Sequence, residues 1–277
     1  NGSMTLTVKA VLNSISAGAV SGADLQIVVD TSSADGQTNF EYRGTSSSTV
    51  VTAQSSGADI TGRNKVLRKT KPTVSLAASG TTMIIGSQVI ARVTVTADSA
   101  EQVSLSAVRW TVTKSDTLMD ITNGGGQSAM RELGQGAHIA GGALLNGACD
   151  AAGGTACTVQ GFFNNEQVIA AGTSKTYELV LTVGAATSDD SITTNIANDT
   201  AVVTGELNSS GAEVDDLDGT NAATSIYNFI WSDNSAIPHN DVDGVTTDGE
   251  DAAASNDWTN GLYVKVLPTD SHSVTFP

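Results

Sequence analysis

Apolar and polar residues alternate with a period of two along many short stretches of this chain. In the first stretch, one face of the expected strand consists of Met4, Leu6, Val8, Ala10 and Leu12. Similar patterns predict strands at residues 24–30, 40–43, 49–52, 66–68, 73–77, 89–96, 103–105, 108–113, 158–163, 167–169, 177–183, 227–231 and 262–267. No segment of useful length has helical periodicity. Short strands separated by polar turns indicate an all-β fold of tandem Ig-like antiparallel β-sandwich domains.

Turn residues and Pro72 divide the chain. Because proline fixes its own φ and forces its predecessor into extended geometry, Pro72 marks a boundary, after which the pattern of the opening partly repeats. We therefore expect three parts. Residues 1–70 form an N-terminal β domain or strand-exchange segment, residues 71–221 a central Ig-like sandwich, and residues 222–277 a C-terminal β segment that packs on the central domain.

Residues 123–156 break the strand pattern. This Gly/Ala-rich segment predicts a long loop that covers a sheet edge or faces a neighbouring molecule. A turn is expected at Asn164 and Asn165, between the strands at 158–163 and 167–169. The acidic stretch 232–257 predicts a second long loop, with residues 262–267 as the returning strand.

Composition and charge narrow the possible partners. Charged residues make up 15% of the chain and the formal net charge is −16. Nucleic acid and anionic lipid both require clusters of Lys and Arg, so neither is an expected partner. No apolar run approaches the roughly 20 residues of a membrane-spanning helix. Charged residues are few, and small and β-branched polar residues are correspondingly abundant, which is typical of secreted, sheet-rich proteins. No signal peptide is present, so we expect a secreted protein in its mature form.

Two cysteines, Cys149 and Cys157, lie close together in a flexible Gly-rich segment. The short interval favours a disulfide, which would indicate an oxidising compartment. The alternative is two free thiols in a loop. A metal site at these cysteines is not expected, because no further Cys or His lies nearby.

Several sequence segments resemble those of one protein family. They are K-T-K-P-T-V-S-L-A at 69–77, V-T-V-T-A-D-S-A-E-Q-V-S-L at 93–105, V-I-A-A-G-T-S-K-T-Y-E-L at 168–179, D-D-S-I-T-T at 189–194, F-I-W-S-D-N-S-A at 229–236, D-W-T-N-G at 257–261 and L-P-T-D-S-H-S-V at 267–274. Together they resemble the large Ser/Thr-rich, Ig-like cell-surface proteins of candidate phyla radiation bacteria, of the Patescibacteria and Parcubacteria type. The resemblance covers residues from about 69 to the end and implies secretion, tandem Ig-like β-domains and a cell-envelope setting. It supplies no catalytic residues.

Two acidic segments have the composition of calcium loops. Their carboxylates, several at alternate positions with a glycine nearby, are Asp215, Asp216 and Asp218 in the first segment and Asp241, Asp243 and Asp248 in the second. Neither segment matches a complete EF-hand. Bound Ca²⁺ and a solvated acidic loop both stay open, and no other cofactor is expected.

Aromatic residues gather near the end of the chain. The set consists of Tyr227, Trp231, Trp258 and Tyr263. Trp231 and Trp258 flank the acidic stretch and adjoin Asp and Asn residues, so we expect a hairpin whose base is stabilised by aromatic packing and Asx turns. The alternative is an exposed patch that stacks on the sugars of surface glycans. Catalytic motifs are absent, and the three histidines are isolated, so an enzyme is not expected.

These features favour an extracellular structural protein that assembles with copies of itself into a surface filament or surface layer. Residues 4–12 could insert as a donor strand into a neighbouring subunit, as in pili, or could close their own sandwich. The alternative function is an adhesin or carbohydrate-binding module of a larger cell-surface protein.

Overall fold

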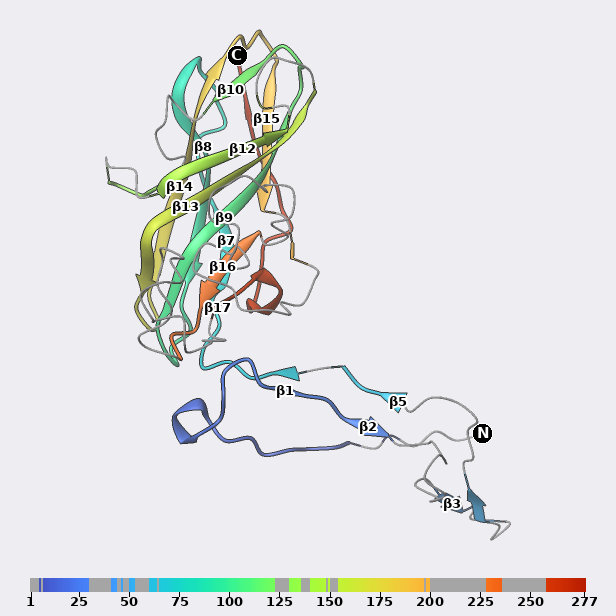
Figure 1. Ribbon diagram of the computed structural model, residues 1–277. Helices are drawn as coiled ribbons and strands as arrows, with labels where there is room; N and C mark the ends of the chain where they lie inside the picture. The colour runs from blue at the N-terminus through green and yellow to red at the C-terminus, as the bar shows by residue number, and fades with distance from the viewer. Residues whose placement is uncertain are drawn as a thin grey trace, which may run out of the picture. The chain divides into compact units, whose positions relative to one another are not determined.

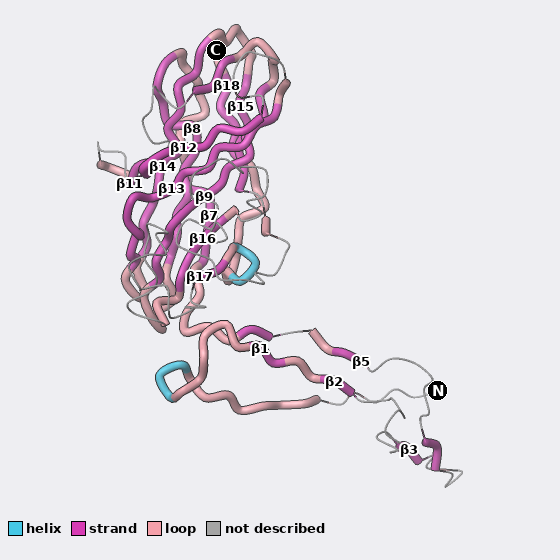
Figure 2. Tube along the Cα trace, in the orientation of Figure 1, coloured by secondary structure: helices cyan, strands magenta, loops and turns pink. Residues whose placement is uncertain are grey.

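The computed structural model describes residues 5, 7–29, 41–43, 46, 50–52, 60–63, 65–122, 130–135, 140–147, 149, 154–196, 198–199, 228–235 and 258–277. The chain separates into two compact units, a first unit of Asn1–Leu67 and a second unit of Arg68–Pro277. This division lies close to the boundary expected near Pro72. Figures 1 and 2 show that nearly all regular structure in both units is β-strand.

The first unit contains three separate two-stranded antiparallel pairs. They are β1 (Asp24–Leu25) with β6 (Lys65–Val66), β2 (Val28–Val29) with β5 (Ile60–Thr61), and β3 (Glu41–Arg43) with β4 (Val50–Thr52). A short 3₁₀ helix, η1 (Ile15–Ala17), precedes them. The single strand predicted over residues 24–30 is therefore divided between two partners, and the pairing register changes by one residue between β1–β6 and β2–β5.

The second unit is built from two antiparallel sheets (Figure 1). The five-stranded sheet has the order β10 (Asp120–Thr122), β14 (Ser174–Gly184), β8 (Gly86–Thr96) and β7 (Thr73–Ala77), and β11 (Met130–Glu132) also pairs with β14. The seven-stranded sheet has the order β12 (Ala140–Gly147), β13 (Ala156–Ile169), β9 (Val103–Lys114), β15 (Ser191–Ile196) and β18 (His272–Thr275), with β16 (Phe229–Ser232) and β17 (Trp258–Thr259) alongside.

The core lies between these two sheets. Along β8, Val93 and Val95 are buried while the intervening Thr94 faces outward and hydrogen-bonds Thr176, with 2.7 Å between the two Oγ1 atoms. On β9, Val108, Trp110 and Val112 enter the same hydrophobic cluster from the other sheet. Each fully buried aliphatic side chain of this size contributes about 1.5–3 kcal/mol. The period-2 pattern thus becomes an all-β sandwich, which confirms the predicted fold class.

The tandem Ig-like arrangement stays a prediction. In its described residues, the first unit holds two-stranded pairs and not a second sandwich. The C-terminal segment expected to pack on the central domain contributes β16, β17 and β18 to the seven-stranded sheet of that domain.

One edge of β9 is shared by two strands. β15 pairs with residues 110–114 of β9, and β16 pairs with residues 104–108. The opposite edge of β9 pairs with β13 along most of its length. The strand predicted as two pieces, at 103–105 and 108–113, is therefore one continuous central strand.

Three sequence predictions are corrected by the structure. The segment 123–156 is not wholly a loop, because β11 and β12 lie within it and pair with β14 and β13. The turn expected at Asn164 and Asn165 is a register shift inside the continuous strand β13. Residues 262–267 do not form a strand, because Asn260 caps a 3₁₀ helix, η3 (Gly261–Tyr263), by accepting a hydrogen bond from Leu262. The returning strand is β17.

Candidate assembly surface

A long antiparallel pairing of backbone runs through the first unit. Residues 22–29 lie against residues 60–63 and 65–67, through β1–β6, β2–β5 and hydrogen bonds between them. At one end Gly22 N–H donates to Leu67 O (3.0 Å), and in the middle Gly62 N–H donates to Ile27 O (2.8 Å). We call these residues the N-terminal ribbon.

The ribbon depends on Gly62 at its irregular centre. A Cβ at this position would lie 2.9 Å from Ile27 O, closer than side-chain carbons approach a carbonyl. The side chain of Gln26 reaches across the same point, since its Nε2 donates to Gly62 O at 2.9 Å. The local sequence therefore holds the two backbones together where the ladder is interrupted.

The apolar side chains of the ribbon are uncovered. Ile27, Val28, Val29 and Ile60 are 40%, 46%, 38% and 64% exposed. Val28 and Val29 are consecutive in a strand, so they point to opposite faces, and each face carries an exposed valine. Among the residues of the first unit whose burial the structure describes, no hydrophobic side chain is buried. A two-stranded ribbon without a packed face is marginally stable alone, so its faces and edges are suited to binding another chain.

The predicted assembly strand at residues 4–12 is not formed in its described part. Val8, Ala10 and Leu12 lie outside any strand and are exposed, and Met4 and Leu6 lie outside the described residues. A period-2 segment becomes a strand only when another strand supplies the hydrogen-bonding ladder. Among the described residues, this segment has no such partner in its own chain. Closure of its own sandwich by this segment is thus not observed, and pairing with another copy stays a prediction.

The disulfide favoured by the sequence is present. Cys149 is bonded to Cys157, and both are almost fully buried. The Cys149 carbonyl accepts hydrogen bonds from Ile121 N–H at 2.8 Å and from the buried Lys114 Nζ at 3.4 Å. The bridge therefore ties the chain after β12 to β13, next to the ends of β9 and β10.

The expected aromatic patch is mostly interior. Trp231 and Trp258 are 1% and 2% exposed, so neither offers a face on which a sugar could stack. Trp231 Nε1 donates to Asn260 O at 2.9 Å, and β16 pairs with β17. The structure thus confirms the expected hairpin base around these tryptophans. Tyr263 is half-buried, with the Arg68 guanidinium 5.3 Å from its ring centre, and Tyr227 lies outside the described residues.

The candidate calcium ligands all lie outside the described residues. They are Asp215, Asp216, Asp218, Asp241, Asp243 and Asp248. Within the described part of the chain, no group of three or more His, Cys, Asp or Glu residues is arranged to hold a metal ion.

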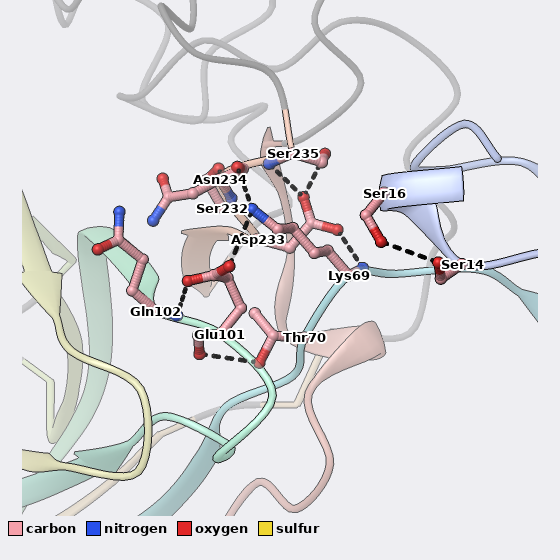
Figure 3. A network of polar contacts seen from close by, with 10 residues as sticks. All are labelled: Ser14, Ser16, Lys69, Thr70, Glu101, Gln102, Ser232, Asp233, Asn234 and Ser235. Atoms are coloured by element: carbon pink, nitrogen blue, oxygen red, sulfur yellow. Dashed lines mark hydrogen bonds and ion pairs between the residues drawn. The ribbon is translucent and has the colours of Figure 1, made fainter. Parts of the chain in front are cut away.

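A partly buried polar network fastens the beginning of the second unit (Figure 3). Lys69 N–H donates to Asp233 Oδ2 at 2.8 Å, and Lys69 Nζ lies 3.2 Å from Glu101 Oε2. Lys69 Nζ also donates to Asn234 O (3.3 Å), while Thr70 Oγ1 donates to Glu101 O (3.2 Å). Asp233 and Asn234 directly follow β16 in the F-I-W-S-D-N-S-A segment. Together with Glu101 in the β8–β9 turn, they hold Lys69 and Thr70 at the start of the second unit.

Asp199 joins the two strands that share an edge of β9. Its carboxylate accepts hydrogen bonds from the backbone N–H groups of Asn228 (2.7 Å), Phe229 (3.3 Å) and Gly261 (2.7 Å). It also accepts one from the side-chain amide of Asn228 (2.9 Å). Burial raises the pKa of Asp199, and the surrounding N–H donors oppose that shift. No sequence pattern predicts this role, because a single Asp after a strand is ordinarily a turn residue.

The sequence also missed the ribbon as an assembly candidate. The available signal was the run of three consecutive apolar residues, Ile27, Val28 and Val29, which leaves no polar face on a short strand. The alternation of apolar and polar residues over 4–12 instead predicts an ordinary half-buried strand in that segment.

A scan against protein-family models found no match for this chain, and a search of curated proteins likewise found none. Within the described residues, no helix is both long and apolar enough to cross a lipid bilayer.

Proposed function

We propose that this chain is an extracellular structural subunit that assembles with copies of itself into a surface filament or surface layer. The observation that carries the proposal is the N-terminal ribbon, which exposes Ile27, Val28, Val29 and Ile60 in the described residues. Apolar β-surface with open edges is stabilised by adding a further strand or sheet from another molecule.

Three other features support the same proposal. The Cys149–Cys157 disulfide fits an oxidising, extracellular compartment. The resemblance of residues 69–277 to bacterial cell-surface proteins points to the same location. The tryptophans Trp231 and Trp258 are buried, which does not favour the adhesin alternative.

Electron microscopy and sedimentation velocity of the purified protein test this function. We expect regular polymers, and a strictly monomeric protein at high concentration would refute the proposal. The double substitution Val28→Ser with Ile60→Ser removes apolar surface from the ribbon and should abolish polymers. Val168→Ser is the matched control, because Val168 is 41% exposed on β13 of the second unit.

Deletion of residues 1–12 tests the mechanism. Loss of polymers with an intact second unit would indicate that these residues act as a donor strand. Polymers that persist would exclude donor-strand exchange by residues 4–12 and leave the ribbon as the contact.

A further inference from the structure

One end of the second unit is formed by three loops, two of which carry large exposed apolar side chains. Gly86, at the start of β8, and Asp120, at the start of β10, flank the end of β14, because they pair with Val183 and Gly184 respectively. The loops that enter these strands therefore lie at the same end of the five-stranded sheet. We call residues 78–85, 115–119 and 185–190 the distal tip. Its exposed apolar residues are Ile84 (56%), Ile85 (58%) and Leu118 (65%).

The distal tip is held in place by hydrogen bonds between its loops. Met83 N–H donates to Thr275 O at 2.7 Å, which ties the first loop to β18. Ser115 Oγ donates to Asp190 Oδ1 at 3.1 Å, and Thr187 N–H donates to Asp190 Oδ2 at 2.7 Å. A surface fixed before binding loses little conformational entropy when a partner docks.

The tip and the ribbon have complementary charges. The tip loops contain Asp116, Asp189 and Asp190 and no basic residue. Asp116 lies beside the apolar surface, since its Oδ1 accepts Leu118 N–H at 2.9 Å. The ribbon combines its exposed apolar residues with two exposed basic residues, Arg63 and Lys65, against a single acidic residue, Asp24. When two apolar surfaces are flanked by charges of opposite sign, one sign on each partner, the charges favour association and fix the orientation of the partners.

The charges of the whole chain favour the same pairing. Residues 1–67 contain four basic and five acidic residues, a net charge of −1, whereas residues 68–277 contain nine basic and 24 acidic residues, a net charge of −15. Contact between two second units is therefore opposed by repulsion, and contact between a first and a second unit is opposed much less.

Strand direction places the tip far from the point where the chain enters the second unit. β8 runs over 11 residues from Gly86 at the tip to Thr96, which pairs with Thr73 next to the entry. At about 3.3 Å a residue, the two ends are roughly 33 Å apart. A contact between the ribbon of one copy and the tip of another uses two different surfaces, and such contacts can repeat without closing.

We propose that the N-terminal ribbon of one copy docks on the distal tip of the second unit of the next copy. Ile84, Ile85 and Leu118 pack against the apolar residues of the ribbon, and the carboxylates of Asp116 and Asp189 face Arg63 and Lys65. This inference rests on the proposed function, since it names the two surfaces through which copies assemble.

Complementation between two variants tests the pairing. The ribbon variant carries Val28→Ser and Ile60→Ser, and the tip variant carries Ile84→Ser and Ile85→Ser. Each alone should form no polymer. An equimolar mixture still has one intact ribbon and one intact tip for each pair, so native mass spectrometry should show a 1:1 heterodimer and no longer species.

Other outcomes overturn the inference in distinguishable ways. If the unaltered protein forms polymers and the tip variant does so equally well, the tip is not the partner surface, although the proposed function stands. If the tip variant forms dimers alone, the ribbon pairs with another ribbon. If the unaltered protein stays monomeric, the proposed function fails as well. Tryptophan fluorescence checks that the second unit keeps its fold in each variant, since Trp110 and Trp231 lie in its core.

Discussion

Gly261 lies where the absence of a side chain lets three segments meet. A Cβ there would be 2.8 Å from Asp199 Oδ2, 3.2 Å from Phe229 Cβ and 3.3 Å from Leu267 Cδ2. The residue also donates its N–H to Asp199. Its small size thus allows the carboxylate, β16 and the chain after η3 to pack at one point.

Gly261→Ala is expected to destabilise the second unit by about 1–3 kcal/mol, because the added methyl group displaces a buried carboxylate and a packed side chain. Urea unfolding followed by tryptophan fluorescence measures the change. Gly80→Ala is the control, since no atom lies within 4 Å of a Cβ at that position. Equal stability of the two variants would contradict the packing described for Gly261.

Glu178 is a nearly buried carboxylate between two arginines. Its Oε1 is 2.7 Å from Arg92 Nη2 and its Oε2 is 2.6 Å from Arg131 Nε. Burial alone would raise the pKa of Glu178, but the hydrogen bonds and charges of Arg131 and Arg92 outweigh it and hold the pKa below its ordinary value of 4.5. The unfolded state therefore binds this proton more readily than the folded state does.

The stability that Glu178 contributes is present above about pH 4.5 and is lost as the pH falls through the lower pKa of the folded state. Glu178→Gln should cost about 1–3 kcal/mol at pH 7. The difference from the unaltered protein should shrink in urea titrations at pH 3. Glu132→Gln, from a half-exposed pair with Lys175 at 3.7 Å, should change stability little at either pH. A pH-independent difference for Glu178→Gln would contradict this account.

At the scale of single elements, strands with alternating large residues could be predicted and Gly-rich ones could not. The pattern of β7 and β14 is visible because valine and leucine alternate with hydroxyl-bearing or charged residues. β12, with the sequence A-G-G-A-L-L-N-G, has no such alternation and becomes a strand because β13 supplies its ladder. The ribbon escaped prediction for a related reason, since the exposure of an apolar side chain depends on which segments fold over it.

The disulfide that follows β12, the edge strand of the seven-stranded sheet, is expected to stabilise the second unit. Replacing Cys149 and Cys157 together by serine should lower the free energy of unfolding by about 2–3 kcal/mol, because the unfolded chain gains freedom around a short loop. The comparison is urea unfolding with and without reductant. Reductant should destabilise the unaltered protein and leave the double serine variant unchanged. An unaltered protein that is insensitive to reductant would argue against a stabilising bridge.

At the scale of the whole molecule, the two units differ in how they are stabilised. The second unit has a continuous core between two sheets, whereas the first unit buries no hydrophobic side chain among the residues whose burial is described. Because the two units bury such different amounts of hydrophobic surface, the free energy of local unfolding should be much lower for the first unit than for the second.

Limited trypsin digestion should therefore cut the first unit first. The exposed Lys9, Arg63 and Lys65 are expected to be cleaved early, whereas Lys114, which is 2% exposed, should be cleaved only after the second unit unfolds. Mass spectrometry of the fragments gives the order. Assembled material should protect Arg63 and Lys65, and equally fast cleavage in polymers would show that assembly leaves the ribbon uncovered.

The sharing of one β9 edge by β15 and β16 has a consequence for how the protein is made. Residues 104–108 obtain their partner only when residues 229–232 have been synthesised. Until then, half of one edge of the central strand keeps unpaired N–H and C=O groups, and such an edge pairs readily with other chains. The nascent chain is thus exposed to misassembly from the synthesis of β9 until that of β16. A helper that binds the growing chain, or export before folding, would let the sheet close in a single step.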